Sequence, residues 1–192
     1  MDFHPSLEQF KALHGNVSKE KFLGKFHDPF LVVDLGGLMV ENLGFRTLAS
    51  TSQERPTELR EKAAASSPRP VVAILAKTGR NSFNNMITLG RAGNNDVVVP
   101  HASISKFHSF FRKDFSTGLL SVWDAGSKYG TSLNGVLVKQ GLGAPLESGA
   151  TLLLARSVQA TFFTPDEFYE YMYLVAKLKG ASAGTAKLKR PL

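Results

Sequence analysis

The sequence predicts a mainly β protein, an antiparallel β-sandwich with a helical extension before it and a helix after it. Eight short runs rich in branched and aromatic residues follow one another between residues 71 and 163. Turn-forming residues separate these runs and no helical pattern lies between them, which is typical of an antiparallel sandwich. On either side of this region, apolar residues recur at the three- and four-residue spacing of helices.

The N-terminal extension, predicted over residues 1–49, is expected to contain two short helices and a strand. Ser6 and Ser18 each precede an apolar pattern at helical spacing, and serine is a favourable N-terminal cap. Gly15 lies between the two patterns and predicts a break there. The branched and aromatic run at residues 30–33 then predicts a strand.

The rest of the chain divides into a linker, the sandwich, a helix and a tail. A linker is predicted over residues 50–69, where Ser, Thr and Pro surround a charged stretch that favours a short helix. The sandwich is predicted over 70–165, the C-terminal helix over 166–180 and a flexible basic tail over 181–192. The eight predicted strands are Val71–Ala76, Met86–Leu89, Val97–Val99, Phe107–Phe111, Leu119–Trp123, Val136–Val138, Leu152–Leu154 and Val158–Phe163.

The composition favours a cytoplasmic protein. The chain has no cysteine, which excludes disulfides, thiolate metal sites and cysteine nucleophiles and fits a reducing compartment. No apolar run approaches the roughly 18–20 residues needed to span a bilayer, and the start of the chain lacks the basic residues of a signal peptide. No membrane partner is therefore expected.

The sequence contains no pattern typical of catalysis or of a cofactor site. It has no Ser/His/Asp set, no phosphate-binding Gly-Lys loop and no paired carboxylates with an evident shared site. His108 is flanked by aromatic residues, and no second His, Asp or Glu is spaced to bind a metal with it. The prediction is a protein that is not an enzyme, with no metal and no cofactor.

Four short loop motifs follow one another between the predicted strands. They are Gly90-Arg91, Ser105-Lys106-Phe107-His108, Ser127-Lys128-Tyr129-Gly130-Thr131 and Asn134-Gly135. A phosphate group is best bound by a bidentate arginine together with hydroxyl and amide donors, and these motifs supply all three. Each motif alone occurs by chance, but the ordered series resembles the forkhead-associated (FHA) domain, a module that binds phosphothreonine peptides. The resemblance covers residues 70–165 and implies an FHA-like β-sandwich.

The resemblance also implies a role for each motif residue. Arg91 matches the arginine that contacts the phosphate, and His108 matches a structural histidine that holds the serine loop, with Gly90 and Asn134 supporting the site. Tyr129 stands where FHA domains that bind phosphopeptides usually carry asparagine, whose paired donor and acceptor a tyrosine cannot reproduce. The residues implied to bind the phosphopeptide are Arg91, Ser105, Lys106, Lys128, Tyr129, Gly130 and Thr131.

Three functional hypotheses follow. The first is phosphothreonine-peptide binding in signalling downstream of a Ser/Thr kinase, with a phosphothreonine-containing partner that is the kinase or its substrate. The second, supported by Tyr129, is a degenerate FHA domain that binds an unphosphorylated protein as a scaffold. The third is nucleic-acid binding, since residues 71–165 carry nine Lys and Arg against four Asp and Glu. It is the weakest of the three, because no stretch interleaves aromatic and cationic residues as stacking platforms require.

Overall fold

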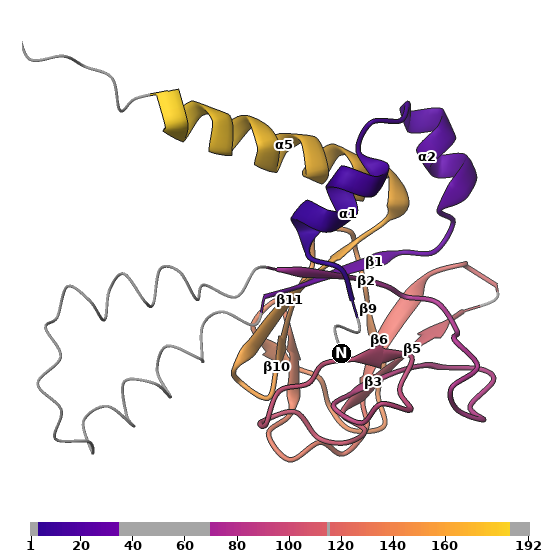
Figure 1. Cartoon of the computed structure of the whole chain (residues 1–192). Helices are drawn as coiled ribbons and strands as arrows, with labels where there is room; N and C mark the ends of the chain where they lie inside the picture. Colours follow the sequence, from indigo (N-terminus) through magenta and orange to yellow (C-terminus); the bar gives the residue numbers. More distant parts are fainter. Residues whose placement is uncertain (1–3, 35–69, 115, 185–192) are drawn as a thin grey trace, which may run out of the picture.

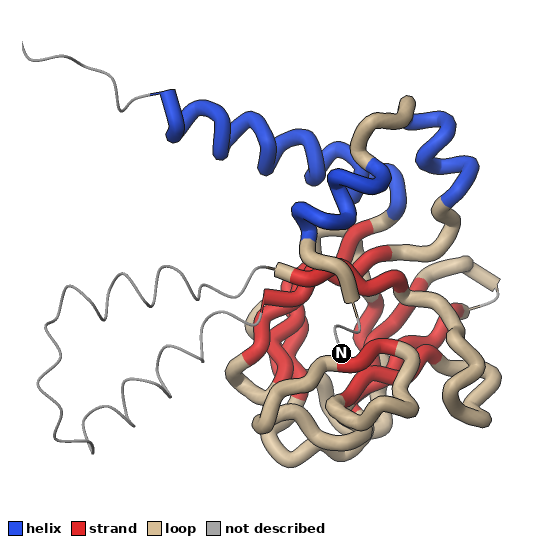
Figure 2. The backbone as a smooth tube through the Cα atoms, in the orientation of Figure 1, coloured by secondary structure: helices blue, strands red, loops and turns tan. Residues whose placement is uncertain are grey.

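The protein is a β-sandwich with helices packed on one side. The computed structural model describes residues 4–34, 70–114 and 116–184, with side chains as far as residue 174. The two sheets face one another, and the helices lie together at one end of the molecule (Figure 1, Figure 2). The mainly β sandwich with helices at both ends of the chain, predicted from the sequence, is confirmed.

The larger sheet has the strand order β2-β1-β11-β10-β7-β8, and the smaller has the order β4-β3-β5-β6-β9. The larger sheet contains β1 (Phe30–Asp34), β2 (Val71–Ile74), β7 (Thr131–Leu133), β8 (Val136–Leu137), β10 (Thr151–Leu154) and β11 (Val158–Phe163). The smaller contains β3 (Ile87–Gly90), β4 (Val97–Val98), β5 (Ser109–Lys113), β6 (Leu120–Asp124) and β9 (Ala144–Pro145). The sequence did not predict β7 and β9, because neither Thr131–Leu133 nor Ala144–Pro145 is a run rich in branched and aromatic residues.

One strand pair departs from the predicted antiparallel arrangement. β4 runs parallel to β3, with Leu89 opposite Val97. The loop between them doubles back along β3, because Asp96 bonds to Thr88 through both its main-chain N–H and its carboxylate. β4 therefore starts beside the end of β3 and runs in the same direction.

The sandwich core lies between the two sheets. Alternate residues of the central strands point into it, as in β1, where Leu31 and Val33 are completely buried. Burial of such side chains is the main stabilising contribution to the fold, at roughly 25 cal/mol per Å² of apolar surface. The completely buried side chains of this core are Leu31, Val33, Ala73, Leu75, Leu89, Val97, Phe111, Val122, Leu152, Leu154 and Val158.

A second apolar cluster joins the helices to the outer face of the larger sheet. The helices are α1 (Leu7–His14), α2 (Lys19–Lys25) and α5 (Pro165–Gly184). Phe30 of β1 stacks on Phe168 of α5 with ring centroids 4.1 Å apart. Phe10 and Phe22, from the two N-terminal helices, contact the same two rings. β1 is thus covered on both faces, which explains why its run of residues is uniformly apolar.

The helix boundaries follow the local signals in the sequence. Ser6 and Gln9 form a reciprocal capping box at α1, with the Ser6 Oγ accepting the Gln9 N–H at 3.1 Å. Ser18 caps α2 through a single bond, in which its Oγ accepts the Lys21 N–H at 3.5 Å. α5 runs to Gly184, four residues beyond its predicted end, since alanines continue the helical sequence.

β1 connects the N-terminal segment to the sandwich. It lies between β2 and β11 and pairs antiparallel with both. The predicted linker over 50–69 and the tail from residue 185 onward lie outside the described residues. How the chain divides into independently folding units stays a prediction.

Candidate functional site

The loops that follow β3 and β4 are tied together by their main chains. The Arg91 N–H donates to the Ser105 carbonyl oxygen at 3.0 Å, and the Ala92 N–H donates to that of Lys106 at 3.2 Å. The Asn95 side chain adds to these bonds, because its Nδ2 donates to the carbonyl oxygens of Ala92 and Lys106, at 2.8 and 2.7 Å. Arg91 and Ser105 are therefore held at a fixed separation by bonds that do not use their side chains.

Gly90 permits this close approach. A Cβ atom at this position would lie 2.3 Å from the Lys106 carbonyl oxygen and 2.9 Å from the Asn95 side-chain nitrogen. Any other residue would push the two loops apart. Asn95, which was not among the residues predicted from the sequence to form the site, is therefore part of its frame.

His108 links the serine loop to the loop that follows β6. Its side chain is completely buried. The Ser105 N–H donates to Nδ1 at 3.3 Å, and Nε2 lies 3.3 Å from the Gly130 carbonyl oxygen. Because Nδ1 accepts a hydrogen bond, the ring proton of the neutral tautomer belongs on Nε2, where it is donated to Gly130.

Burial lowers the pKa of His108, and it outweighs the opposing effects of the Asp124 charge and of the bond to Gly130. The imidazole is thus neutral at pH 7. A neutral ring that bonds at both nitrogens holds the two loops together without adding a charge beneath the site.

Asp124, at the end of β6, organises the third loop from below. Its Oδ1 accepts the N–H groups of Gly126 and Ser127, both at 2.9 Å. Its Oδ2 accepts the hydroxyls of Ser127 and Thr131, at 2.7 and 2.8 Å. Burial alone would raise the pKa of this carboxyl, but the bonds from Ser127, Thr131 and Gly126 lower it below its usual value. Asp124 is therefore an ionised support for the loop.

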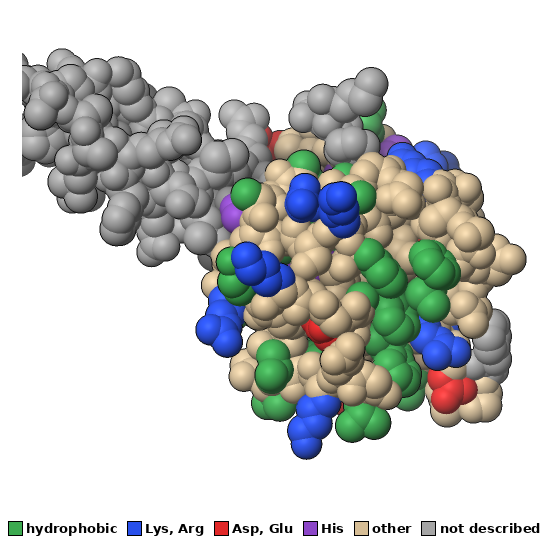
Figure 3. Space-filling model, turned by 90° about the horizontal axis from the view of Figure 1, so that it is seen from below, with side chains coloured by type: hydrophobic (Ala, Val, Ile, Leu, Met, Phe, Trp, Pro, Cys, Tyr) green, Lys and Arg blue, Asp and Glu red, His purple; other side chains and the backbone are tan. Residues whose placement is uncertain are grey.

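The three loops surround an open cleft of about 690 Å³. It is lined by Arg91, Ala102, Ser103, Ile104, Ser105, Lys106, Phe107, Lys128 and Tyr129. Three of these side chains are cationic, none is acidic, and no ion pair joins the three cations to another described residue. The face turned away from the helices carries scattered Lys and Arg side chains and few acidic ones (Figure 3).

Ser105 and Tyr129 occupy distinct positions at the cleft. The Ser105 Oγ accepts the Lys128 N–H at 3.1 Å, which leaves the hydroxyl proton free to be donated to a ligand. The Tyr129 side chain is 43% exposed, and the Lys128 ammonium lies 5.0 Å from the centre of its ring. Such a cation–π contact holds Lys128 next to the cleft.

The structure brings together five of the residues implied to bind a phosphopeptide and separates the others from the cleft. Arg91, Ser105, Lys106, Lys128 and Tyr129 line the cleft, whereas Gly130 and Thr131 do not. The Thr131 side chain is completely buried and points to Asp124. Gly130, with φ +80°, allows the sharp turn before it. Asn134 forms the hairpin turn between β7 and β8, and its Oδ1 accepts the Thr151 N–H at 2.8 Å.

Sequence reasoning missed Asp124 and Phe107 as parts of the site. The signal for Asp124 was available, because an aspartate followed three residues later by Ser127 favours a turn in which the carboxylate accepts main-chain N–H groups. Over the described part of the chain, no cluster of three or more His, Asp or Glu side chains is arranged to hold a metal ion. Within the same residues, no helix is long and apolar enough to cross a membrane.

The motif-bearing segment is similar to known proteins. Residues 87–155 match the family model of the FHA domain. No curated protein sequence matches the chain. Among solved structures, the MEK1 FHA domain in complex with a HOP1 phosphothreonine peptide is 27% identical, covering 42% of this chain and 81% of that one, with a TM-score of 0.37.

Two further solved structures are similar over more of the chain. The FHA domain of CT664 from Chlamydia trachomatis is 13% identical, covering 71% of this chain and 96% of that one, with a TM-score of 0.44. The FHA domain of a hypothetical protein from Arabidopsis thaliana is 16% identical, covering 72% and 86% of the two chains, with a TM-score of 0.45.

Proposed function

We propose, from the FHA domain that this chain contains, that the protein binds phosphothreonine-containing proteins in signalling downstream of a Ser/Thr kinase. The observation that carries the proposal is the convergence of Arg91, Lys106 and Lys128 on one cleft that contains no carboxylate. An FHA domain is a binding module, so no catalysis is assigned to it. The partner is a kinase or a substrate of one.

The chemistry of the cleft suits a phosphate on a threonine. Such a group carries about −1.5 to −2 charges at pH 7 and three strong acceptor oxygens. The Arg91 guanidinium can bind two of these oxygens in a bidentate manner, and the Ser105 hydroxyl can donate to the third. Lys106 and Lys128 add positive charge to the same cleft, which favours the doubly ionised form of the phosphate.

The rigidity of the frame supports the same function. The loops that carry Arg91 and Ser105 are fixed by main-chain bonds, and His108 and Asp124 hold the third loop in register with them. Loops that are already ordered lose less conformational freedom when a ligand binds. A small phosphorylated peptide therefore needs few contacts beyond the phosphate itself.

Tyr129 favours a second candidate function, that of a degenerate FHA domain that binds an unphosphorylated protein as a scaffold. Its hydroxyl cannot grip a peptide backbone with a paired donor and acceptor as an amide does. Its ring is partly exposed at the rim of the cleft, where it could instead pack on an apolar partner. The cationic lining of the cleft favours the phosphate-binding function over this one.

The test is a binding screen of the purified full chain against a degenerate phosphothreonine peptide library and its unphosphorylated counterpart. The proposal expects only the phosphorylated library to be retained and Arg91→Ala to abolish retention. Lys139→Ala, which removes the same charge from an exposed position outside the cleft, should leave retention unchanged. Equal retention of both libraries by the parent and by Arg91→Ala would favour the scaffold function.

A further inference from the structure

Four aromatic rings form a row on the outer face of the smaller sheet. Phe83, Phe107, Phe110 and Trp123 follow one another with centroid separations of 5.8, 6.0 and 5.9 Å, and successive ring planes are inclined by 14, 30 and 10°. Phe110 of β5 lies opposite Trp123 of β6 in the sheet register. This aromatic row gathers residues up to 40 positions apart in the sequence, so it is a product of the fold.

The aromatic row meets the cleft at its second ring, Phe107. Phe107 lines the cleft together with Arg91 and Lys106 and stacks on Phe83 and Phe110. Phe83 is 46% exposed, so its ring offers apolar surface next to the rim. An extended peptide advances about 3.3–3.6 Å per residue, so a chain anchored in the cleft reaches Phe107 and Phe83 within about three residues.

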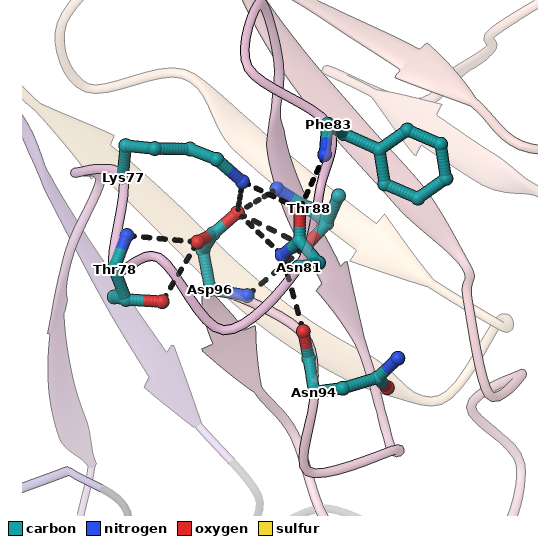
Figure 4. Close-up of polar contacts among 7 residues, drawn as sticks. All are labelled: Lys77, Thr78, Asn81, Phe83, Thr88, Asn94 and Asp96. Atoms are coloured by element: carbon teal, nitrogen blue, oxygen red, sulfur yellow. Dashed lines mark hydrogen bonds and ion pairs between the residues drawn. The ribbon is translucent and has the colours of Figure 1, made fainter.

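A hydrogen-bond network fixes Phe83 at this position. The Phe83 N–H donates to the Asn81 Oδ1 at 3.2 Å. The Asn81 Nδ2 in turn donates to the Thr88 hydroxyl at 3.0 Å, the Asn94 carbonyl oxygen at 3.1 Å and an Asp96 carboxylate oxygen at 3.2 Å (Figure 4). The Phe83 ring points away from these polar groups (Figure 4).

Asp96 anchors this network in the sheet. Its carboxylate accepts the Thr88 N–H, the Thr78 N–H and hydroxyl, and the Lys77 ammonium at 2.8 Å. Burial alone would raise the pKa of Asp96, but the bonds from Lys77, Thr88 and Thr78 hold it well below its usual range. A permanently ionised, fully bonded carboxylate thus ties the exposed loop that carries Phe83 to β3.

We propose that the aromatic row selects the residues next to the phosphothreonine, favouring peptides with a large apolar or aromatic side chain within about three positions of it. The proposal rests on the proposed function and names the peptide class that the same cleft would take. An aromatic pair of this kind adds about three- to tenfold in affinity beyond simple burial, which is enough to discriminate between peptides that carry the same phosphate.

The arrangement of charge favours a peptide over a single-stranded nucleic acid as the occupant. A nucleic-acid strand needs cations along the whole track beside its stacking rings. Here Arg91, Lys106 and Lys128 gather at the one cleft beside Phe107, as a single phosphate group requires. Arg112 already occupies the Trp123 ring at the far end of the row, with its guanidinium carbon 5.7 Å from the ring centre.

The test is a phosphothreonine peptide library in which each position from three before to three after the phosphothreonine is varied in turn. Two peptides built from the result are then titrated, one with the preferred apolar residue and one with alanine in its place. Phe83→Ala should weaken binding of the apolar peptide about three- to tenfold and change the alanine peptide less than twofold. Leu119→Ala, which removes another exposed apolar side chain away from the row, should change neither.

Further measurements separate the outcomes. Asn81→Ala, which leaves the Phe83 ring intact but releases its loop, should reduce the same preference. The aromatic-row proposal would be overturned if Phe83→Ala kept the preference for apolar residues. It would also be overturned if the library showed no apolar selection while binding still required Arg91. Either result would leave the proposed function standing. If the parent binds oligothymidine tightly and Phe83→Ala weakens that binding, the aromatic row would instead be a nucleic-acid-binding surface, which would overturn the aromatic-row proposal. A parent protein that binds no phosphothreonine peptide would refute both proposals.

Discussion

The Ser105 N–H donates to the His108 Nδ1 at 3.3 Å, three residues further along the chain. This bond fixes the serine loop from below, while the other ring nitrogen reaches Gly130 in the loop after β6. Two of the loops at the cleft therefore depend on one buried, uncharged side chain. Its removal has consequences for stability, for pH dependence and, indirectly, for binding.

Replacing His108 with alanine should lower the free energy of unfolding by about 1–3 kcal/mol, because two buried polar groups lose their partner. A lower midpoint in a thermal melt checks this expectation. His27→Ala, at an exposed histidine in the connection before β1, is the matched control and should melt like the parent. A melt of His108→Ala identical to that of the parent would contradict the structural role.

The stability of the protein should fall as the pH drops below about 6.5, the ordinary pKa of histidine. Because burial lowers the pKa of His108 in the folded chain, the unfolded chain takes up a proton first. Each pH unit below that value then costs up to about 1.4 kcal/mol of stability for this group. Burial also lowers the pKa values of His4, His14 and His101, which add to the same trend.

Urea denaturation at pH 7.5 and pH 5 measures how much of this pH-dependent loss of stability comes from His108. His108→Asn has no titratable group at this position, so its free energy of unfolding should fall less between the two pH values than that of the parent. Equal losses in the two proteins would show that His108 is not held neutral by the fold.

Replacing Arg91 with alanine should weaken phosphothreonine peptide binding by about 2–5 kcal/mol, since the phosphate loses its bidentate partner. The side chain is exposed and its main-chain bonds to the serine loop remain, so the melting temperature should not change. Isothermal titration and a thermal melt of the same sample measure both quantities. Binding as tight as that of the parent would place the phosphate elsewhere.

The exchange Tyr129→Asn should tighten phosphopeptide binding by about 0.5–1.5 kcal/mol by restoring a hydrogen-bond pair to the peptide backbone. The parent forms fewer hydrogen bonds to the peptide backbone, so its affinity should depend more on exposed charges. Salt screens such charges, with a Debye length of about 10 Å at 0.1 M, so the parent should lose more affinity than the variant as salt is added. Titrating one phosphopeptide into both proteins at low and high salt measures these effects. Weaker binding by the variant would instead indicate that the ring packs on the ligand.

Much of the secondary structure is determined locally and could be predicted from the sequence. Ser6 and Ser18 cap the helices they precede, because the capping bond spans only three residues. The strands follow from short branched and aromatic runs, whose preference for extended backbone acts within each run. Arg91, Ser105, Lys106 and Lys128 could also be selected, because their order along the chain fits a recognisable series of loops.

Only the tertiary structure decided which of these residues meet. The packing of β1 against β11 joins residues about 130 positions apart, and the aromatic row assembles rings from two loops and two strands. Thr131 was expected at the ligand, yet it is buried against Asp124, because only the register of β7 shows which side of the sheet its side chain faces. Pairing and register depend on distant partners competing for the same core, so no local pattern in the sequence specifies them.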